Sequence, residues 1–191
     1  MELKDIKINH KNFYYPPGGI LLWIIIFLEL MTFGIALVSL AFSAKENPQL
    51  FHESSLHLNR TFGTINTIFL LTSGFFVANA VYNFKERNFY KASFQLKIAM
   101  LGGLLFIVLK SIEYYIKIEA GYLLDTNSFF TFYWLLTGFH IIHVVVGLVI
   151  LFMLNRNLKT KAIEDVEASA AFWHMCDLIW LLLFPVLYLI F

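Results

Sequence analysis

The stretch that decides the fold is FFTFYWLLTGFHIIHVVVGLVILFML, residues 129–154. It contains no Asp, Glu, Lys or Arg, and its two histidines, His140 and His143, are the exceptions to its apolar character. A helix needs roughly 20 apolar residues to cross a bilayer core of about 30 Å. The stretch is too long and too continuously apolar for a strand of a membrane barrel. We therefore predict a transmembrane helix.

Four further segments are also long and mostly apolar, and they are residues 18–42, 62–84, 98–116 and 168–191. Over the whole chain of 191 residues, 59% are hydrophobic and 14% are charged. A soluble domain averages about 45–50% apolar and about 25% charged residues. The prediction is an all-α integral membrane bundle of five transmembrane helices, with residues 18–191 as one domain. A disordered chain, a coiled coil and, at a net charge of +1, a nucleic-acid binder are excluded.

Basic residues between the predicted spans indicate the orientation. Ten lie on one side, in residues 1–17 and in the second-to-third and fourth-to-fifth connections, and three lie on the other side. Because Lys and Arg mark the cytoplasmic side, we expect the N-terminus inside and the C-terminus outside. Residues 1–17 are then a cytoplasmic segment, too polar for a signal peptide.

Glu29 lies eleven residues into the first predicted span, roughly 17 Å deep at 1.5 Å per residue. An ionisable group at that depth costs about 2.5–3.5 kcal/mol to insert, so it requires a partner or a function. One reading is a proton-handling carboxyl or a lipid or subunit contact. The other is a protonated carboxyl that hydrogen-bonds a neighbouring helix.

Two pairs of ionisable residues have helical i, i+3 spacing, His140 with His143 and His174 with Asp177, so each pair is expected on one helix face. Glu113 has Lys110 and Lys117 within a turn. The Glu-x-x-His spacing of di-metal bundles occurs in no span, and haem ligation by facing histidines is conceivable but not required. We expect no metal here and favour a buried polar network that ties the helices together over a direct chemical role.

Features of nucleophilic catalysis and nucleotide binding are also lacking. Cys176, the single cysteine, lies in an apolar span where a thiol is usually inert packing. The sequence has no phosphate-binding glycine loop. We therefore predict no catalytic residue in this chain.

The stretch Thr137-Gly138-Phe139-His140-Ile141-Ile142-His143-Val144, followed by Gly147, resembles the signature of subunit III of haem–copper respiratory oxidases. Glu167 followed by Phe172-Trp173-His174-Met175-Cys176-Asp177-Leu178-Ile179-Trp180-Leu181 and Tyr188 resembles it too. The step Glu113-Tyr114-Tyr115, and Glu29 in the first span, fit the same family. The similarity runs from about residue 18 to the end.

The resemblance implies a non-catalytic subunit of a proton-pumping terminal oxidase that reduces oxygen to water. It would pack on catalytic subunit I, which holds the haem and copper, bind structural phospholipids and support proton uptake. Glu29 would handle protons, or it would contact that subunit or lipid. A buried polar seam would unite seven residues: Glu113, His140, His143, Glu167, His174, Asp177 and Trp180. The expected location is the bacterial cytoplasmic membrane, with other oxidase subunits, a larger respiratory supercomplex and phospholipids as partners.

Long members of that family have seven helices, so the chain resembles the short five-helix form. The resemblance leaves open an accessory role in a nitric oxide reductase and the choice between cytochrome c and quinol as electron donor. An autonomous transporter or membrane enzyme is a further alternative, although five helices without a broken helix or a repeat are a poor transporter plan.

Overall fold

The computed structural model describes residues 19–191, and the predicted cytoplasmic segment 1–17 lies outside them. Among the described residues, five helices are long and apolar enough to cross a membrane. They are α1 (Ile20–Glu46), α3 (Arg60–Lys85), α4 (Phe89–Glu119), α5 (Ser128–Arg156) and α6 (Ile163–Tyr188). A short helix α2 (Pro48–Leu56) and a 3-10 turn η1 (Leu158–Thr160) complete the order. The predicted all-α membrane bundle is confirmed, and the chain is a multi-pass membrane protein.

The helices extend beyond most of the predicted spans, because hydrophobicity marks the membrane-embedded part and not the helix end. Asparagines begin three of them: Asn59, Asn88 and Asn127 accept hydrogen bonds from backbone N–H groups in the first turns of α3, α4 and α5. Such caps satisfy donors that have no partner within the helix. The last predicted span, in contrast, runs past the end of its helix, since α6 ends at Tyr188, and it misses the start of the helix at Ile163.

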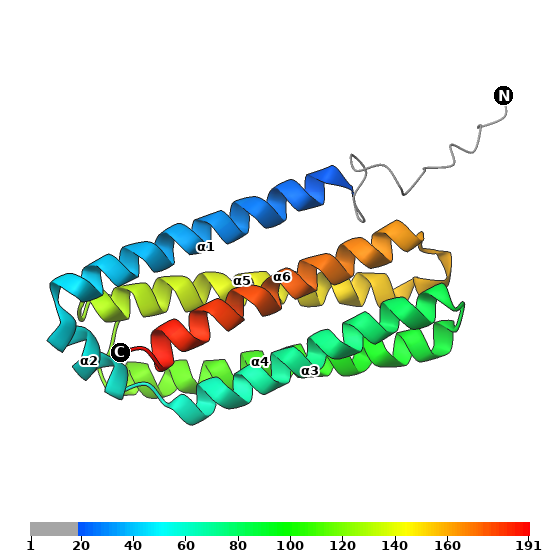
Figure 1. Ribbon diagram of the computed structural model, residues 1–191. Coiled ribbons are helices and arrows are strands. Elements are labelled where there is room, and N and C mark those ends of the chain that lie inside the picture. Colours follow the sequence, from blue (N-terminus) through cyan, green and yellow to red (C-terminus); the bar gives the residue numbers. More distant parts are fainter. Residues whose placement is uncertain (1–18) are drawn as a thin grey trace.

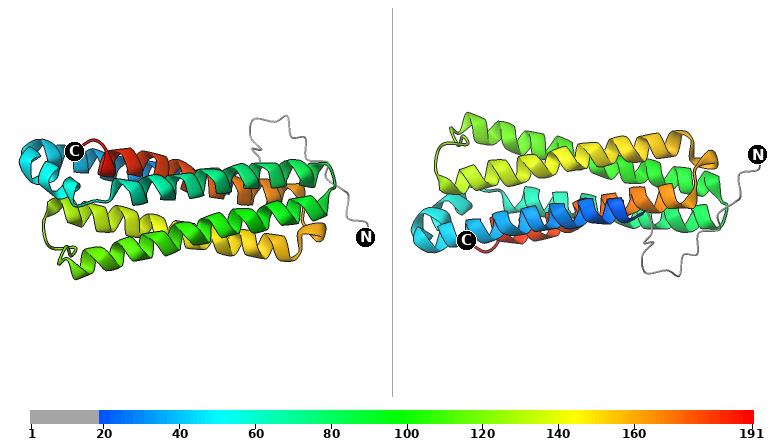
Figure 2. Two further views of the ribbon diagram at one scale, coloured as in Figure 1. Left: turned by 90° about the horizontal axis from the view of Figure 1, so that it is seen from below. Right: turned by 90° about the horizontal axis from the view of Figure 1, so that it is seen from above.

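The helices run alongside one another in a single elongated bundle (Figures 1 and 2). The α3–α4 and α5–α6 connections lie at one end, and α2, the α4–α5 connection and the C-terminus lie at the other. Helix α6 is central: half of its most apolar 18-residue window is buried, against 11% of that of α1. It packs on α1, α3 and α5, so side chains on α6 can meet residues from most of the bundle.

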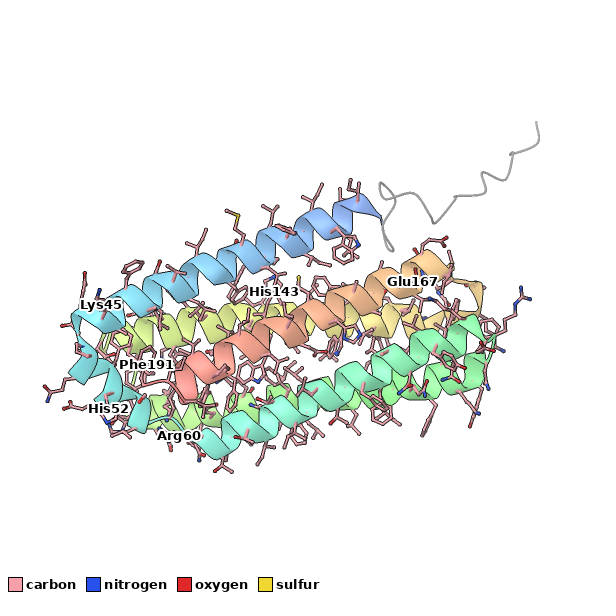
Figure 3. The ribbon with its side chains drawn as sticks, in the orientation of Figure 1. Lys45, His52, Arg60, His143, Glu167 and Phe191 are labelled. Atoms are coloured by element: carbon pink, nitrogen blue, oxygen red, sulfur yellow. The ribbon has the colours of Figure 1, made fainter. Side chains whose placement is uncertain are left out.

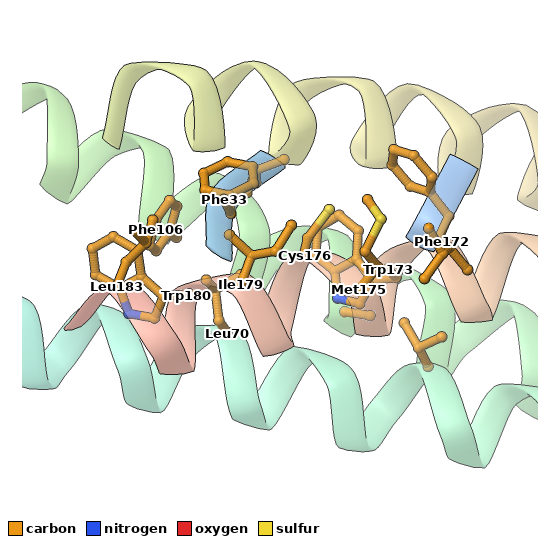
Figure 4. Close-up of a cluster of buried hydrophobic side chains, with 14 of the residues drawn as sticks. Phe33, Leu70, Phe106, Phe172, Trp173, Met175, Cys176, Ile179, Trp180 and Leu183 are labelled. Carbon is orange, nitrogen blue, oxygen red and sulfur yellow. The ribbon is translucent and has the colours of Figure 1, made fainter. Parts of the chain in front are cut away.

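Close packing of the helices depends on small residues at their crossings. The indole of Trp173 on α6 is fully buried, and it lies against Gly103 of α4 and Gly147 of α5. Figure 4 shows this side chain within the cluster that also includes Phe106, Cys176 and Trp180. Small residues allow helix backbones to approach, which is the main source of association where lipid is as apolar as the core.

Substitution of Gly103 by alanine should destabilise the bundle by about 1–3 kcal/mol, the usual cost of overpacking. A Cβ at this position would lie 2.6 Å from Cη2 of Trp173 and 2.9 Å from Cδ2 of Leu148. Gly34→Ala is the matched control, because a Cβ there has no neighbour within 4 Å. SDS titration of the purified chain in mixed micelles measures both variants. Equal midpoints would contradict the packing described here.

Candidate functional site

The largest group of polar side chains inside the bundle surrounds Lys110 of α4. Its Nζ donates to Oε2 of Glu113 at 3.0 Å, to the hydroxyl of Tyr133 at 3.1 Å and to that of Tyr188 at 2.6 Å. The Tyr188 hydroxyl in turn donates to Oε1 of Glu113 at 2.8 Å. Lys110, Glu113, Tyr133 and Tyr188 are all buried. Of the two lysines within a turn of Glu113, Lys110 is thus its partner, and two tyrosines extend this pair to α5 and α6.

Aromatic rings complete the surroundings of the buried ammonium. The rings of Tyr114, Tyr133, Trp180 and Tyr188 have their centroids 4.7 to 5.4 Å from Nζ of Lys110. Such contacts stabilise a cation that has lost its water. This lysine therefore has a negative partner, two hydroxyl acceptors and aromatic faces in place of solvent.

His140 is fully buried beside this group. Its ring stacks on Trp180 at a centroid distance of 5.4 Å and meets the edge of Phe106 at 5.6 Å. The Trp180 indole donates to the hydroxyl of Thr67 on α3 at 2.9 Å. Within residues 19–191, neither ring nitrogen of His140 has a hydrogen-bond partner. His140 thus packs here as an aromatic ring between Phe106 and Trp180.

His143 faces away from this group and toward α1. Its Nε2 lies 3.3 Å from Oε2 of Glu29, and its ring packs against Phe33. The two histidines therefore do not share a face as predicted: three residues along a helix rotate a side chain by about 60°, which is enough to direct them to different neighbours. Figure 3 shows His143 near the middle of the bundle. Glu29 thus has a specific partner, from a helix that the sequence could not identify.

His174 and Asp177 form a pair on α6 that faces α3. Nδ1 of His174 lies 3.3 Å from Oδ2 of Asp177. A Cβ at Gly74 of α3 would lie 2.2 Å from the same Oδ2, so this glycine makes room for the carboxylate. The Asp177 side chain is buried, but 45% of the His174 side chain is exposed.

Glu167 lies at the end of the bundle opposite to α2, as Figure 3 shows. It pairs with Lys85 of α3 at 2.7 Å, where 53% of the lysine side chain is exposed. Surface pairs of this kind contribute about 0–1 kcal/mol. Near the other end, Lys117 donates to the backbone oxygen of His57, and so it is not the partner of Glu113.

The predicted seam is therefore not one continuous buried row. Glu113, His140 and Trp180 share one cluster, whereas His143, the His174–Asp177 pair and Glu167 face three other neighbours. His174 and Glu167 are also not buried. The reason is that each helix of a bundle has several neighbours, so polar residues of similar depth are drawn to different interfaces.

Two side chains of the main cluster, Tyr133 and Tyr188, were not among the predicted site residues, although Tyr188 belongs to the stretch that resembles the family. A signal for the first exists, since Tyr133 precedes His140 by seven residues and therefore lies on the same face two turns away. Among residues 19–191, no group of three or more His, Cys, Asp or Glu side chains is arranged to hold a metal ion. The arrangement that is present can neutralise charges and join helices through hydrogen bonds.

Comparison with models of protein families matches residues 56–190 to the family described as "Cytochrome c oxidase subunit III". Among curated proteins, "Cytochrome c oxidase subunit 3" of Drosophila melanogaster is 32% identical over 129 residues, which are 65% of this chain and 48% of that protein. "Probable cytochrome c oxidase subunit 3" of Mycobacterium leprae (strain TN) is 29% identical over 168 residues, 85% of this chain and 82% of that protein.

A third relative, "Heme-copper oxidase subunit I+III" of Aeropyrum pernix, is 27% identical over 181 residues, 88% of this chain and 22% of that protein. The chain spans about half the length of the Drosophila melanogaster and Rhipicephalus sanguineus relatives that it matches. The family match, in contrast, extends over most of the chain. It includes the polar side chains described above, except Glu29 on α1. The chain belongs to the cytochrome c oxidase subunit III family.

Proposed function

We propose that this chain is the non-catalytic subunit III of a haem–copper terminal oxidase. It packs on catalytic subunit I, which holds the haem and copper of the complex, and this chain holds neither. The complex reduces oxygen to water and translocates protons. The observation that carries the proposal is the Aeropyrum pernix relative, whose name joins subunits I and III in one chain and which aligns with 88% of this one.

The proposed location is a bacterial cytoplasmic membrane, with the N-terminus inside. Relatives from Mycobacterium leprae and Corynebacterium diphtheriae support a bacterial setting. The charges at the two ends of the bundle support the orientation. Five basic residues gather around the α3–α4 and α5–α6 connections, and they are Lys85, Arg87, Arg156, Lys159 and Lys161. That end is the cytoplasmic one by the positive-inside rule.

A phospholipid chain is the proposed occupant of a hollow between α1 and α5. The hollow is almost entirely apolar, and its lining includes Phe33, Ala36, Phe132 and Phe139. The half-buried pair of Glu29 and His143 lies beside it, since Phe33 packs on both Phe139 and His143. Glu29, which is paired with His143 within the subunit, would then support proton uptake or contact lipid.

Affinity purification of the full chain, tagged and expressed in its native host, tests the proposed function. A mild detergent extract should yield the chain together with a haem-bearing subunit, visible in the reduced-minus-oxidised spectrum and identified by mass spectrometry. An unrelated tagged multi-pass protein from the same host is the control. Recovery of this chain without a haem-bearing partner would refute the proposal. Reduction of nitric oxide and not oxygen by the purified complex would replace the oxidase role with the reductase one.

A further inference from the structure

His174 occupies an unusual position for an ionisable side chain. It lies eleven residues after the first residue of α6, Ile163, and fourteen before the last, Tyr188. At 1.5 Å per residue these are about 17 Å and about 21 Å, so His174 is close to the midplane of any bilayer that α6 spans. Nevertheless 45% of its side chain is exposed on the surface of the bundle.

The other ionisable side chains at such depths behave differently. In the described part of the chain, Lys110, Glu113, His140 and Asp177 are buried, and Glu29 and His143 are at most half-buried and pair with each other. His174 is thus the single strongly exposed one in the inner parts of the long helices of residues 19–191. A polar group facing hydrocarbon costs several kcal/mol when unpaired, and for this reason intramembrane ionisable residues face protein or water.

The ring of His174 is held with one nitrogen free. Nδ1 lies 3.3 Å from Oδ2 of Asp177, so one of the two ring nitrogens is engaged within the chain. The other ring nitrogen, Nε2, has no partner within residues 19–191, and it is free to form a hydrogen bond with a polar group of another molecule.

Exposed side chains on α6 form a ridge that includes His174. Helix α6 lies between α1 and α3 on the side of the bundle turned to the viewer in Figure 1. Its exposed ridge continues one and two turns from His174 with Leu178, Leu181 and Leu182. The face of α4 and α5 also exposes aliphatic side chains near mid-helix, such as Leu104, Val145 and Val149, but no ionisable side chain accompanies them. That face matches lipid, whereas the α6 face matches a helix with a polar group at mid-depth.

We propose that the α6 ridge of His174, Leu178, Leu181 and Leu182 is the surface on which a transmembrane helix of the haem-bearing catalytic subunit docks. A polar side chain near the midpoint of that helix forms a hydrogen bond with Nε2 of His174. The proposal rests on the proposed function, because it identifies the face used by the partner named there. It also gives Asp177 a role, which is to orient the imidazole toward the partner.

Photo-cross-linking in native membranes tests the docking surface. A benzophenone amino acid is placed at Leu178 on the α6 ridge or, as the matched control, at Val149 on the α5 face; these side chains are 46% and 52% exposed. Illumination should join Leu178 to the haem-bearing subunit and Val149 to lipid. Adducts of Leu178 with lipid alone or with a second copy of this chain would overturn the proposal. It would also be overturned if the haem-bearing subunit were cross-linked from Val149 and not from Leu178. Loss of the haem-bearing subunit from all samples would overturn the proposed function as well.

Substitution of His174 tests the hydrogen bond. His174→Leu should lower the haem recovered per tagged chain about threefold, the equilibrium factor of an average interhelical hydrogen bond in a membrane. His174→Gln keeps an acceptor and should retain most of the haem. The amount of tagged chain in the membrane should be the same for both variants, because the side chain is exposed. Equal haem recovery in the Leu and Gln variants would overturn the role of Nε2.

Discussion

Replacement of Lys110 by methionine should destabilise the bundle by about 3–5 kcal/mol, the cost of leaving one partner of a buried ion pair alone. The side chains of Lys110 and Glu113 are 0% and 2% exposed, so water cannot replace the lost ammonium. The Tyr188 hydroxyl would remain as a donor to Glu113, but the hydrogen bonds of Lys110 to Tyr133 and Tyr188 would disappear. The measurement is unfolding of the purified chain in micelles by added SDS, followed by circular dichroism.

A double substitution separates the loss of the pair from the loss of packing. Lys110→Met combined with Glu113→Leu removes both charges and should recover most of the lost stability, since an apolar pair of similar volume is often equal to a buried ion pair. Lys97→Met on the same helix is the matched control, because Lys97 is exposed and should change stability by less than about 0.5 kcal/mol. If Lys110→Met and Lys97→Met had the same unfolding midpoint in SDS, the cluster would not contribute to the stability of the bundle.

Replacement of Trp173 by alanine should also cost about 3–5 kcal/mol, as for other large aromatic side chains removed from a packed core. Its indole fills the space that Gly103 and Gly147 leave between α4, α5 and α6. The indole N–H has no partner in residues 19–191, so the substitution removes packing without removing a hydrogen bond. The result therefore reports on packing alone, in the same SDS titration.

Two further variants serve as comparisons for Trp173→Ala. Trp173→Phe keeps part of the aromatic volume and should cost less than half as much as alanine. Trp134→Ala removes a half-buried indole whose N–H donates to the backbone oxygen of Tyr122, and it should cost less than Trp173→Ala. A larger loss for Trp134 than for Trp173 would mean that α6 is not held by the two glycines.

The transmembrane helices themselves were predictable from the sequence. Each segment with a long apolar run is a helix in the structure, because lipid permits no other conformation for an isolated span. Helix α2 was not predicted: Pro48–Leu56 is short and only partly apolar, and it forms at the end of the bundle, where its Phe51 packs on Phe129 and Phe191. Its stability thus comes from contacts that no local pattern contains.

The site could be predicted only one helix at a time. The sequence identified Glu113 with its neighbour Lys110 at i−3, and His174 with Asp177, because helical spacing brings residues three or four apart together. It could not identify His143 as the partner of Glu29, or Tyr188 as a partner of Lys110, because these contacts join residues 114 and 78 positions apart.

By itself, then, the sequence determined that this protein is a membrane bundle, which segments cross the bilayer and which ionisable residues lie deep within it. Those properties follow from hydrophobicity and helical periodicity, which act over a few residues. Only the tertiary structure decided which of the ionisable residues have partners on other helices and that His174 has a face turned outward. That decision depends on the rotation of each helix and on which neighbours it meets, and both are set by the packing of small and large side chains between helices.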